Sequence, residues 1–158
     1  MIMLSTHFTQ DEMTKSQTAE RMGIVNMPDV NQIVCMKKLL INVLEPIREH
    51  YDKPIQPSSG FRSPALCEAI GSKSTSQHCK GEAVDFEVMG VSNLEVAEWI
   101  MQNLEFDQLI LECWHGANTG WVHVSYTDHP NRMEVLTSLV TATSASSLPL
   151  GVEASSVI

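Results

Sequence analysis

Residues 82–88 alternate between two kinds of side chain, and this alternation constrains the fold more than any other feature. Its valines and phenylalanine fall on one side of an extended chain and Asp85 on the other, because successive side chains of a strand point to opposite faces. Residues 121–126 repeat the pattern, with His123 on the less apolar side. We therefore predict a sheet with one face buried in a core, and with a carboxylate and an imidazole on the other.

Other segments predict helices around this sheet. Apolar residues at steps of three and four predict a long helix that starts near residues 26–29 and runs into the forties, where Pro46 should kink or end it. Capping boxes at Thr9 and Ser92 predict two more helices, and Ser63, followed by a proline, predicts a fourth. Residues 15–28 are predicted to be irregular.

The remaining strands are predicted from shorter patterns. Residues 53–58 contain two prolines, which exclude a central strand, so we expect an edge strand there. Residues 106–112 should pair with residues 121–126 across a glycine-containing loop, and residues 133–140 supply a further strand.

The composition predicts one domain. A chain of 158 residues with 43% hydrophobic content can bury a core, which we place at residues 1–137. Residues 138–158 are mostly Ser, Ala, Leu and Val and are expected to be a poorly ordered tail. The net charge of -9 excludes nucleic acid or an anionic membrane as a partner held by bulk charge, and we expect a monomer.

The N-terminal residues lack a basic region followed by a long apolar run. We therefore expect no signal peptide and no stable membrane insertion, so that the protein is cytoplasmic at synthesis. The four cysteines contain no Cys-x-x-Cys pair and are expected to be free thiols. Cys79 follows His78 directly and would point elsewhere on an extended segment, so we leave it out of any ligand set.

Three residues form a candidate zinc site. His78 lies seven residues before Asp85, and His123 lies on the second strand of the alternating pair. Two histidines and one carboxylate suit zinc and leave a fourth position for water. The alternative is that the histidines are ordinary hydrogen-bonded residues. We favour the metal because three separate positions would otherwise have to agree by accident.

Further polar residues fit a hydrolytic site around this metal. Glu112, at the end of a strand, is the candidate acid/base, whereas its alternative is a solvated strand-end glutamate. Arg62 can clamp a substrate carboxylate, or form a surface ion pair. Ser76 and Gln77 can orient the first ligand or the substrate. Glu87 and His115 rank behind Glu112 for an acid/base or metal-supporting role.

These residues carry a family resemblance. The pattern Ser-x-His-x-x-Gly-x-Ala-x-Asp at residues 76–85, followed by Trp-Val-His-Val-Ser at residues 121–125, resembles the zinc D-Ala-D-Ala carboxypeptidases and related phage endolysin peptidases. The similarity runs from about residue 8 to residue 126 and includes residues 59–64 and 106–110. It implies an α+β fold, with a small antiparallel sheet and helices packed on one face, shared with the zinc domain of Hedgehog proteins.

The resemblance also implies a function and a ligand set. Zinc would be bound by His78, Asp85 and His123, Arg62 would recognise a substrate carboxylate, and stem peptides of peptidoglycan would be cleaved. The setting implied is a phage lysis enzyme that acts on the cell wall, or else a peptidase in the host cytoplasm.

One departure from the family pattern keeps alternatives open. Many relatives carry the catalytic acid three residues before the second histidine, where this chain has Gly120. We favour Glu112 as the replacement. The alternatives are a non-catalytic zinc-binding module and a virion structural protein that retains the fold.

Overall fold

The fold is organised around a five-stranded sheet, seen in a computed structural model that describes residues 1–116 and 118–138. The strands are β1 (Ile55–Ser59), β2 (Ala83–Val88), β3 (Gln108–Glu112), β4 (Trp121–Ser125) and β5 (Glu134–Thr137), in the spatial order β1-β2-β4-β3-β5. All neighbours are antiparallel except β3 and β5, which are parallel. The predicted α+β class is confirmed, and β1 is the edge strand expected from its prolines.

The two faces of the sheet differ as the alternation predicts. The face with Val84, Val122 and Leu109 is buried in the main hydrophobic core, against the long helix and the helix that follows β2. The other face carries Asp85 and His123. The period of two in the sequence therefore decides which residues enter the core and which meet on the opposite face.

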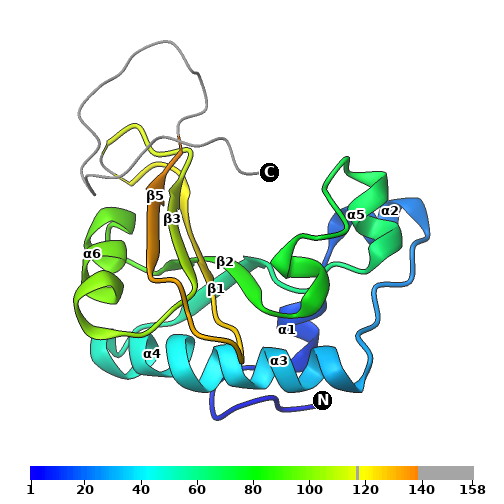
Figure 1. Cartoon of the computed structure of the whole chain (residues 1–158), viewed down its shortest axis with the longest axis horizontal. Coiled ribbons are helices and arrows are strands. Elements are labelled where there is room, and N and C mark those ends of the chain that lie inside the picture. The colour runs from blue at the N-terminus through cyan, green and yellow to red at the C-terminus, as the bar shows by residue number, and fades with distance from the viewer. Residues whose placement is uncertain (117, 139–158) are drawn as a thin grey trace.

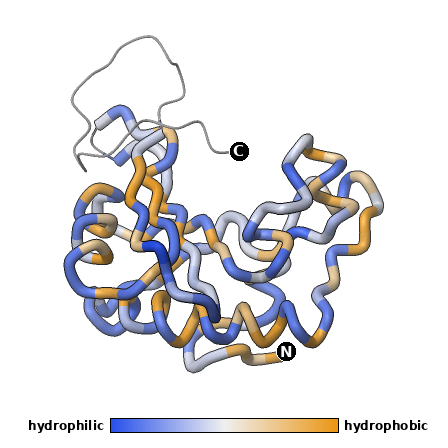
Figure 2. The backbone as a smooth tube through the Cα atoms, viewed as in Figure 1, coloured by the Kyte–Doolittle hydropathy of each residue, from blue (hydrophilic) through white to orange (hydrophobic). Residues whose placement is uncertain are grey.

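We expected Pro46 to kink or end the long helix; the helix does not end there, so that alternative was wrong. Helix α3 (Val30–Leu39) continues through a π-helical turn, η1 (Leu40–Leu44), into α4 (Glu45–Tyr51). In this turn the Glu45 backbone N–H donates to the Leu40 carbonyl. The wider turn makes room for the proline ring one turn on, where it would otherwise clash with a carbonyl. Figure 2 shows polar and apolar residues alternating along this helix.

Helix α6 (Asn93–Asn103) starts at the predicted cap, Ser92, whose hydroxyl accepts from the Glu95 backbone N–H. Its buried side chains include Ala97 and Ile100, whereas Met101 is exposed. In Figure 1, α6 lies beside the sheet and α3–α4 run below it. These helices supply the apolar layer behind the strands.

The remaining helices gather at the opposite end of the molecule (Figure 1). Helix α1 (Gln10–Thr14) has the predicted Thr9 capping box, and α5 (Pro64–Ala69) has the predicted Ser63 cap. The prediction that residues 15–28 are irregular was wrong in part. Helix α2 (Gln17–Met22) lies there, capped by Ser16 and ended by Gly23 in the left-handed conformation. Six residues are too short to show a helical period.

The C-terminal part of the chain is described only to Ser138. This residue, the first of the predicted tail, is buried, and its N–H donates to the Leu111 carbonyl. The rest of that segment, residues 139–158, lies outside the described residues. Within the described ranges, no helix is both long and apolar enough to cross a membrane.

Candidate metal centre

Two of the three predicted metal ligands face each other across the central strands. Asp85 of β2 and His123 of β4 are directly paired in register, and both point away from the core. The Asp85 Oδ1 atom lies 2.8 Å from His123 Nδ1. Both side chains are buried, so the sheet itself fixes their positions.

His78 reaches the same point from outside the sheet. It lies on η2, a 3-10 turn (Gln77–Lys80) that ends at Gly81 in the left-handed conformation, φ 76°. The His78 Nδ1 atom donates to the Gly60 carbonyl at 2.8 Å, which leaves Nε2 free to face Asp85 Oδ1 at 3.4 Å. A hydrogen bond of this kind fixes the tautomer and the ring orientation of a metal-binding histidine.

The three side chains together can hold one metal ion. Their candidate ligand atoms all lie within 4.8 Å of one another, and all three residues are buried. Burial alone would raise the pKa of Asp85, but the charges and hydrogen bonds of His78 and His123 hold that pKa well below its usual range. A carboxylate that stays ionised beside two imidazoles suits a divalent cation. The structure thus brings together all three predicted ligands.

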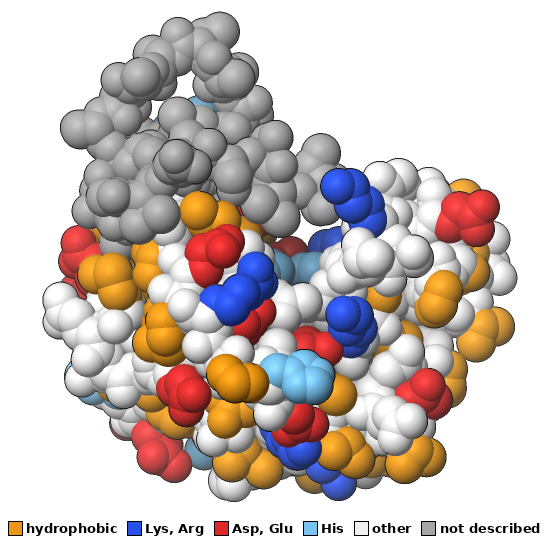
Figure 3. Space-filling view, viewed as in Figure 1, with side chains coloured by type: hydrophobic (Ala, Val, Ile, Leu, Met, Phe, Trp, Pro, Cys, Tyr) orange, Lys and Arg blue, Asp and Glu red, His pale blue; other side chains and the backbone are white. Residues whose placement is uncertain are grey.

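Arg62 lies against the outer oxygen of the same carboxylate. Its Nη2 atom is 3.4 Å from Asp85 Oδ2, and its Nε atom donates to Ser59 Oγ at 3.0 Å. Nη1 has no hydrogen-bond partner among the described residues. The guanidinium therefore supports Asp85 and still offers a donor to the cleft. Figure 3 shows a hollow on this face of the molecule, with basic and histidine side chains inside it.

Glu112 lies on the metal-bearing face of the sheet, two residue pairs along from His123. It is paired with Trp121, whereas Ile110 is paired with His123. Glu112 is buried, and its Oε2 atom accepts a hydrogen bond from Ser138 Oγ at 2.7 Å. Burial raises the pKa of this carboxyl group. It is thus a protonatable group near the ligands rather than a solvated strand-end glutamate.

The backbone explains why position 120 is a glycine in this chain. Its φ of 69° lies in the left-handed region, and a Cβ atom there would come within 1.9 Å of the Glu112 carbonyl oxygen. A side chain at this position would force the strand end to move. The loop conformation therefore excludes an acidic residue at position 120.

The side chains of Ser76 and Gln77 form hydrogen bonds that stabilise the turn carrying His78. The Ser76 hydroxyl accepts from the His78 backbone N–H at 3.3 Å. The Gln77 amide donates to Asp107 Oδ2 at 2.9 Å, and Asp107 is held in turn by the Arg132 guanidinium. Sequence reasoning missed Asp107 as a support of the site, although it lies in a segment that carries the family resemblance.

Two cysteines correct a prediction. Cys67 of α5 and Cys79 of η2 form a disulfide, with a sequence separation of 12, so the expectation of four free thiols was wrong. Cys35 and Cys113 are free. The disulfide links the turn that carries His78 to the helix that follows Arg62.

The two residues ranked behind Glu112 are less well placed for proton transfer. His115 is exposed, and its backbone N–H donates to Thr119 Oγ1. Glu87 is exposed two residues after Asp85 on β2, where it accepts from Asn93.

The family known as Peptidase M15 matches residues 6–125 of this chain. The match spans η2, β2 and β4, and so includes all three candidate ligands. No curated protein matches the chain.

Proposed function

This chain belongs to the peptidase M15 family, and we propose that it is a zinc peptidase that hydrolyses peptide bonds in the stem peptides of peptidoglycan. The observation that carries the proposal is the convergence of His78, Asp85 and His123 in one buried cluster. Two neutral imidazoles and one carboxylate form the donor set of catalytic zinc sites that keep a position open. Bound there, zinc would act as a Lewis acid and lower the pKa of a water molecule to about 7.

We assign proton transfer to Glu112. Its Oε2 atom is occupied by Ser138, while Oε1 accepts no hydrogen bond within the described part of the chain. Oε1 would take a proton from the attacking water and deliver it to the nitrogen of the leaving amine. Its raised pKa brings the carboxyl closer to the working pH, where an acid/base group transfers protons most effectively.

We assign substrate positioning to Arg62. Its Nη1 group, which no described residue engages, would bind a carboxylate of the peptide beside the ligand cluster. Gln77 and Ser76 would hold the His78 turn in place rather than contact the substrate directly, because their side chains already bind Asp107 and the turn's own backbone.

A phage lysis enzyme is the setting we propose, with a peptidase of the host cytoplasm as the second setting. The protein would act as a monomer and bind no nucleic acid. The net charge of -9 disfavours adsorption to an anionic wall by bulk charge, so recognition would rest on the cleft.

Digestion of purified peptidoglycan tests the proposal. The zinc-loaded protein is incubated with it, and the released peptides are identified by mass spectrometry. Free D-Ala indicates a carboxypeptidase, whereas larger fragments indicate an endopeptidase. Glu112→Gln should lower the release rate by at least a hundredfold, while Glu49→Gln, an exposed change on α4, should not. Zinc binding without any release by the wild type would contradict the proposal and favour the non-catalytic zinc module.

A further inference from the structure

Ser138 contacts the proposed acid/base group, although it lies outside the part of the chain that the family matches. The match ends at residue 125, and both β5 and Ser138 follow it. Ser138 is 3% exposed, and its Oγ atom donates to Glu112 Oε2 at 2.7 Å. A hydrogen bond from a hydroxyl to an ionised carboxylate is about twice as strong as one between neutral groups. A residue that the sequence placed in the tail is therefore bound to the proposed site.

The parallel pairing of β3 with β5 sets this contact. Leu111 is paired with Thr137. The next residues along the two strands, Glu112 and Ser138, lie side by side and point to the same face of the sheet. That face is the metal-bearing one, because Leu111 points into the hydrophobic core. The direction of β5 thus brings the hydroxyl to the carboxylate.

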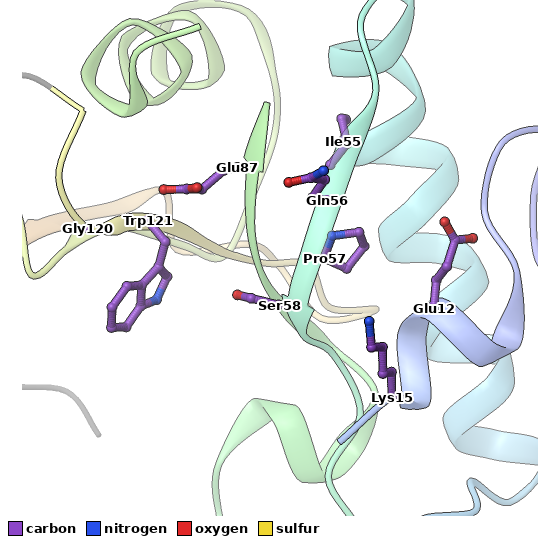
Figure 4. A pocket seen from close by; sticks show the side chains of 9 residues that line it. All are labelled: Glu12, Lys15, Ile55, Gln56, Pro57, Ser58, Glu87, Gly120 and Trp121. Carbon is purple, nitrogen blue, oxygen red and sulfur yellow. The ribbon is translucent and has the colours of Figure 1, made fainter. Parts of the chain in front are cut away.

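The same row of side chains reaches an open cavity at its other end. Glu112 is paired with Trp121, which lines a cavity of about 630 Å³ together with Glu87 (Figure 4). Glu112 itself is 6% exposed, so little water reaches its carboxylate. Within the described part of the chain, the hydroxyl of Ser138 supplies the one hydrogen bond that this carboxylate accepts. The position of the carboxylate therefore depends on this serine.

Three further hydrogen bonds hold Ser138 in place. Its N–H donates to the Leu111 carbonyl at 2.9 Å, and its carbonyl accepts from the Trp114 N–H at 3.2 Å. Its Oγ atom accepts from the Cys113 N–H at 3.3 Å. A serine hydroxyl has a single hydrogen, and with the Cys113 N–H directed at its oxygen that hydrogen is given to Glu112. Ser138 thus presents a fixed donor to Oε2.

We propose that Ser138 is a positioning residue that reserves the Oε1 atom of Glu112 for proton transfer. A proton on Oε2 would face the hydrogen of the Ser138 hydroxyl. The proton removed from the attacking water would therefore bind Oε1, and from there it would pass to the nitrogen of the leaving amine. Glu112 ends the cycle ionised, as it began, and Ser138 keeps its own hydrogen throughout. The inference rests on the proposed peptidase function and adds to it a residue beyond the family match.

Rates on soluble peptidoglycan fragments test the part that Ser138 has in turnover. Ser138→Ala should lower kcat by about tenfold and leave KM within about twofold, because the carboxylate loses its orientation while substrate contacts remain. Ser138→Thr keeps a hydroxyl and should recover most of the rate. The matched control is Thr137→Val, which removes the neighbouring buried hydroxyl, one without a hydrogen-bond partner among the described residues, and should match wild type. Equal kcat values for wild type and Ser138→Ala would overturn the inference and leave the peptidase function standing.

The pKa of Glu112 separates the inference from the proposed function. Carboxyl carbon signals of the zinc-free protein are followed by NMR as the pH changes, and Glu112 is assigned by the signal missing in Glu112→Gln. The charges of His123, Asp85 and Arg62 act on this carboxyl in wild type and in Ser138→Ala alike, so a difference between them reports the lost hydroxyl.

Loss of a donor that favours the ionised form should raise the pKa of Glu112 by about one pH unit in Ser138→Ala. Such a rise supports the inference even if wild type cleaves no peptide. An unchanged pKa in Ser138→Ala overturns it even if wild type is an active peptidase.

Discussion

The two histidines of the candidate metal centre are held in different ways. His123 lies inside β4, between two other strands, and its position follows from sheet pairing. His78 lies on a short 3-10 turn, tied to its surroundings by the Gly60 carbonyl, the Cys67–Cys79 disulfide and the Gln77–Asp107 hydrogen bond. One ligand thus depends on the regular core, and the other on a few individual contacts.

Because the two histidines are held in different ways, we expect mutations near each of them to affect different quantities: the free energy of unfolding near His123, and zinc affinity near His78. Damage to the core beneath β4 should lower the free energy of unfolding and leave the ligand geometry of the folded protein intact. Damage to the supports of the turn should weaken zinc binding in a protein that is still folded.

Removal of the disulfide should have the largest effect. The Cys67→Ser/Cys79→Ser protein should lose about 3 kcal/mol of unfolding free energy, as expected for a loop of this length. Its zinc affinity should fall as well, because the His78 turn is no longer linked to α5. Denaturant unfolding and chelator competition measure the two quantities. Cys35→Ser, which changes a free thiol, is the control. Unchanged zinc affinity in the double variant would show that the turn needs no such link.

A core truncation beneath the other histidine should act on stability alone. Val124 is fully buried next to His123 in the sequence and points to the opposite face. Val124→Ala should lower the unfolding free energy by about 2 kcal/mol through the cavity that it leaves. Zinc affinity, measured under conditions where the protein is folded, should stay within about threefold of wild type. A larger loss of affinity would mean that β4 does not position its histidine independently of core packing.

Asp107→Asn should weaken zinc binding with a smaller loss of stability. It removes the charge that the Arg132 guanidinium pairs with and disturbs the acceptor of the Gln77 amide. Zinc affinity should fall by roughly tenfold, the lower end for partners that orient a ligand. Glu134→Gln removes the other carboxylate near Arg132 without touching Gln77 and should bind zinc normally. Equal affinities in the two variants would remove Asp107 from the supports of the turn.

The two carboxylates of the cleft should give opposite pH dependences of stability in the zinc-free protein. Burial raises the pKa of Glu112 above 4.5, so the unfolded chain loses this proton first, and stability falls as the pH rises from 4.5 through the folded-state pKa. Asp85 has a lowered pKa, so its stabilising effect is present above 3.8 and is lost as the pH falls. Unfolding curves of wild type and Glu112→Gln across this range test the first trend. A wild-type curve parallel to that of the variant would contradict it.

The sequence predicted the strand-borne half of the site better than the half on the turn. Alternation alone assigns Asp85 and His123 to one face, because a strand has only two faces. The distance between Cys67 and Cys79 depends instead on how α5 packs beside η2, which no local pattern encodes. The same holds for the contact between Gln77 and Asp107, which are 30 residues apart.

The misjudged helix boundaries have a similar cause. Proline at position 46 breaks an α-helix by local rules, yet here a π turn accommodates it and the buried side chains on both sides keep the helix in the core. Tertiary packing outweighed the local preference. The direction of β5, which is parallel to β3, is also set outside its own residues. It follows from the way the chain returns past β3.

Zinc binding by single-ligand variants tests whether His78, Asp85 and His123 together hold one zinc ion. Purified wild type, His78→Ala, Asp85→Ala and His123→Ala are titrated with zinc against a competing chelator, and folding is confirmed by circular dichroism. Wild type should bind one zinc ion per chain, and each variant should lose more than a hundredfold in affinity, beyond the effect of losing a supporting residue. Full zinc occupancy in folded His123→Ala would contradict the proposed ligand set.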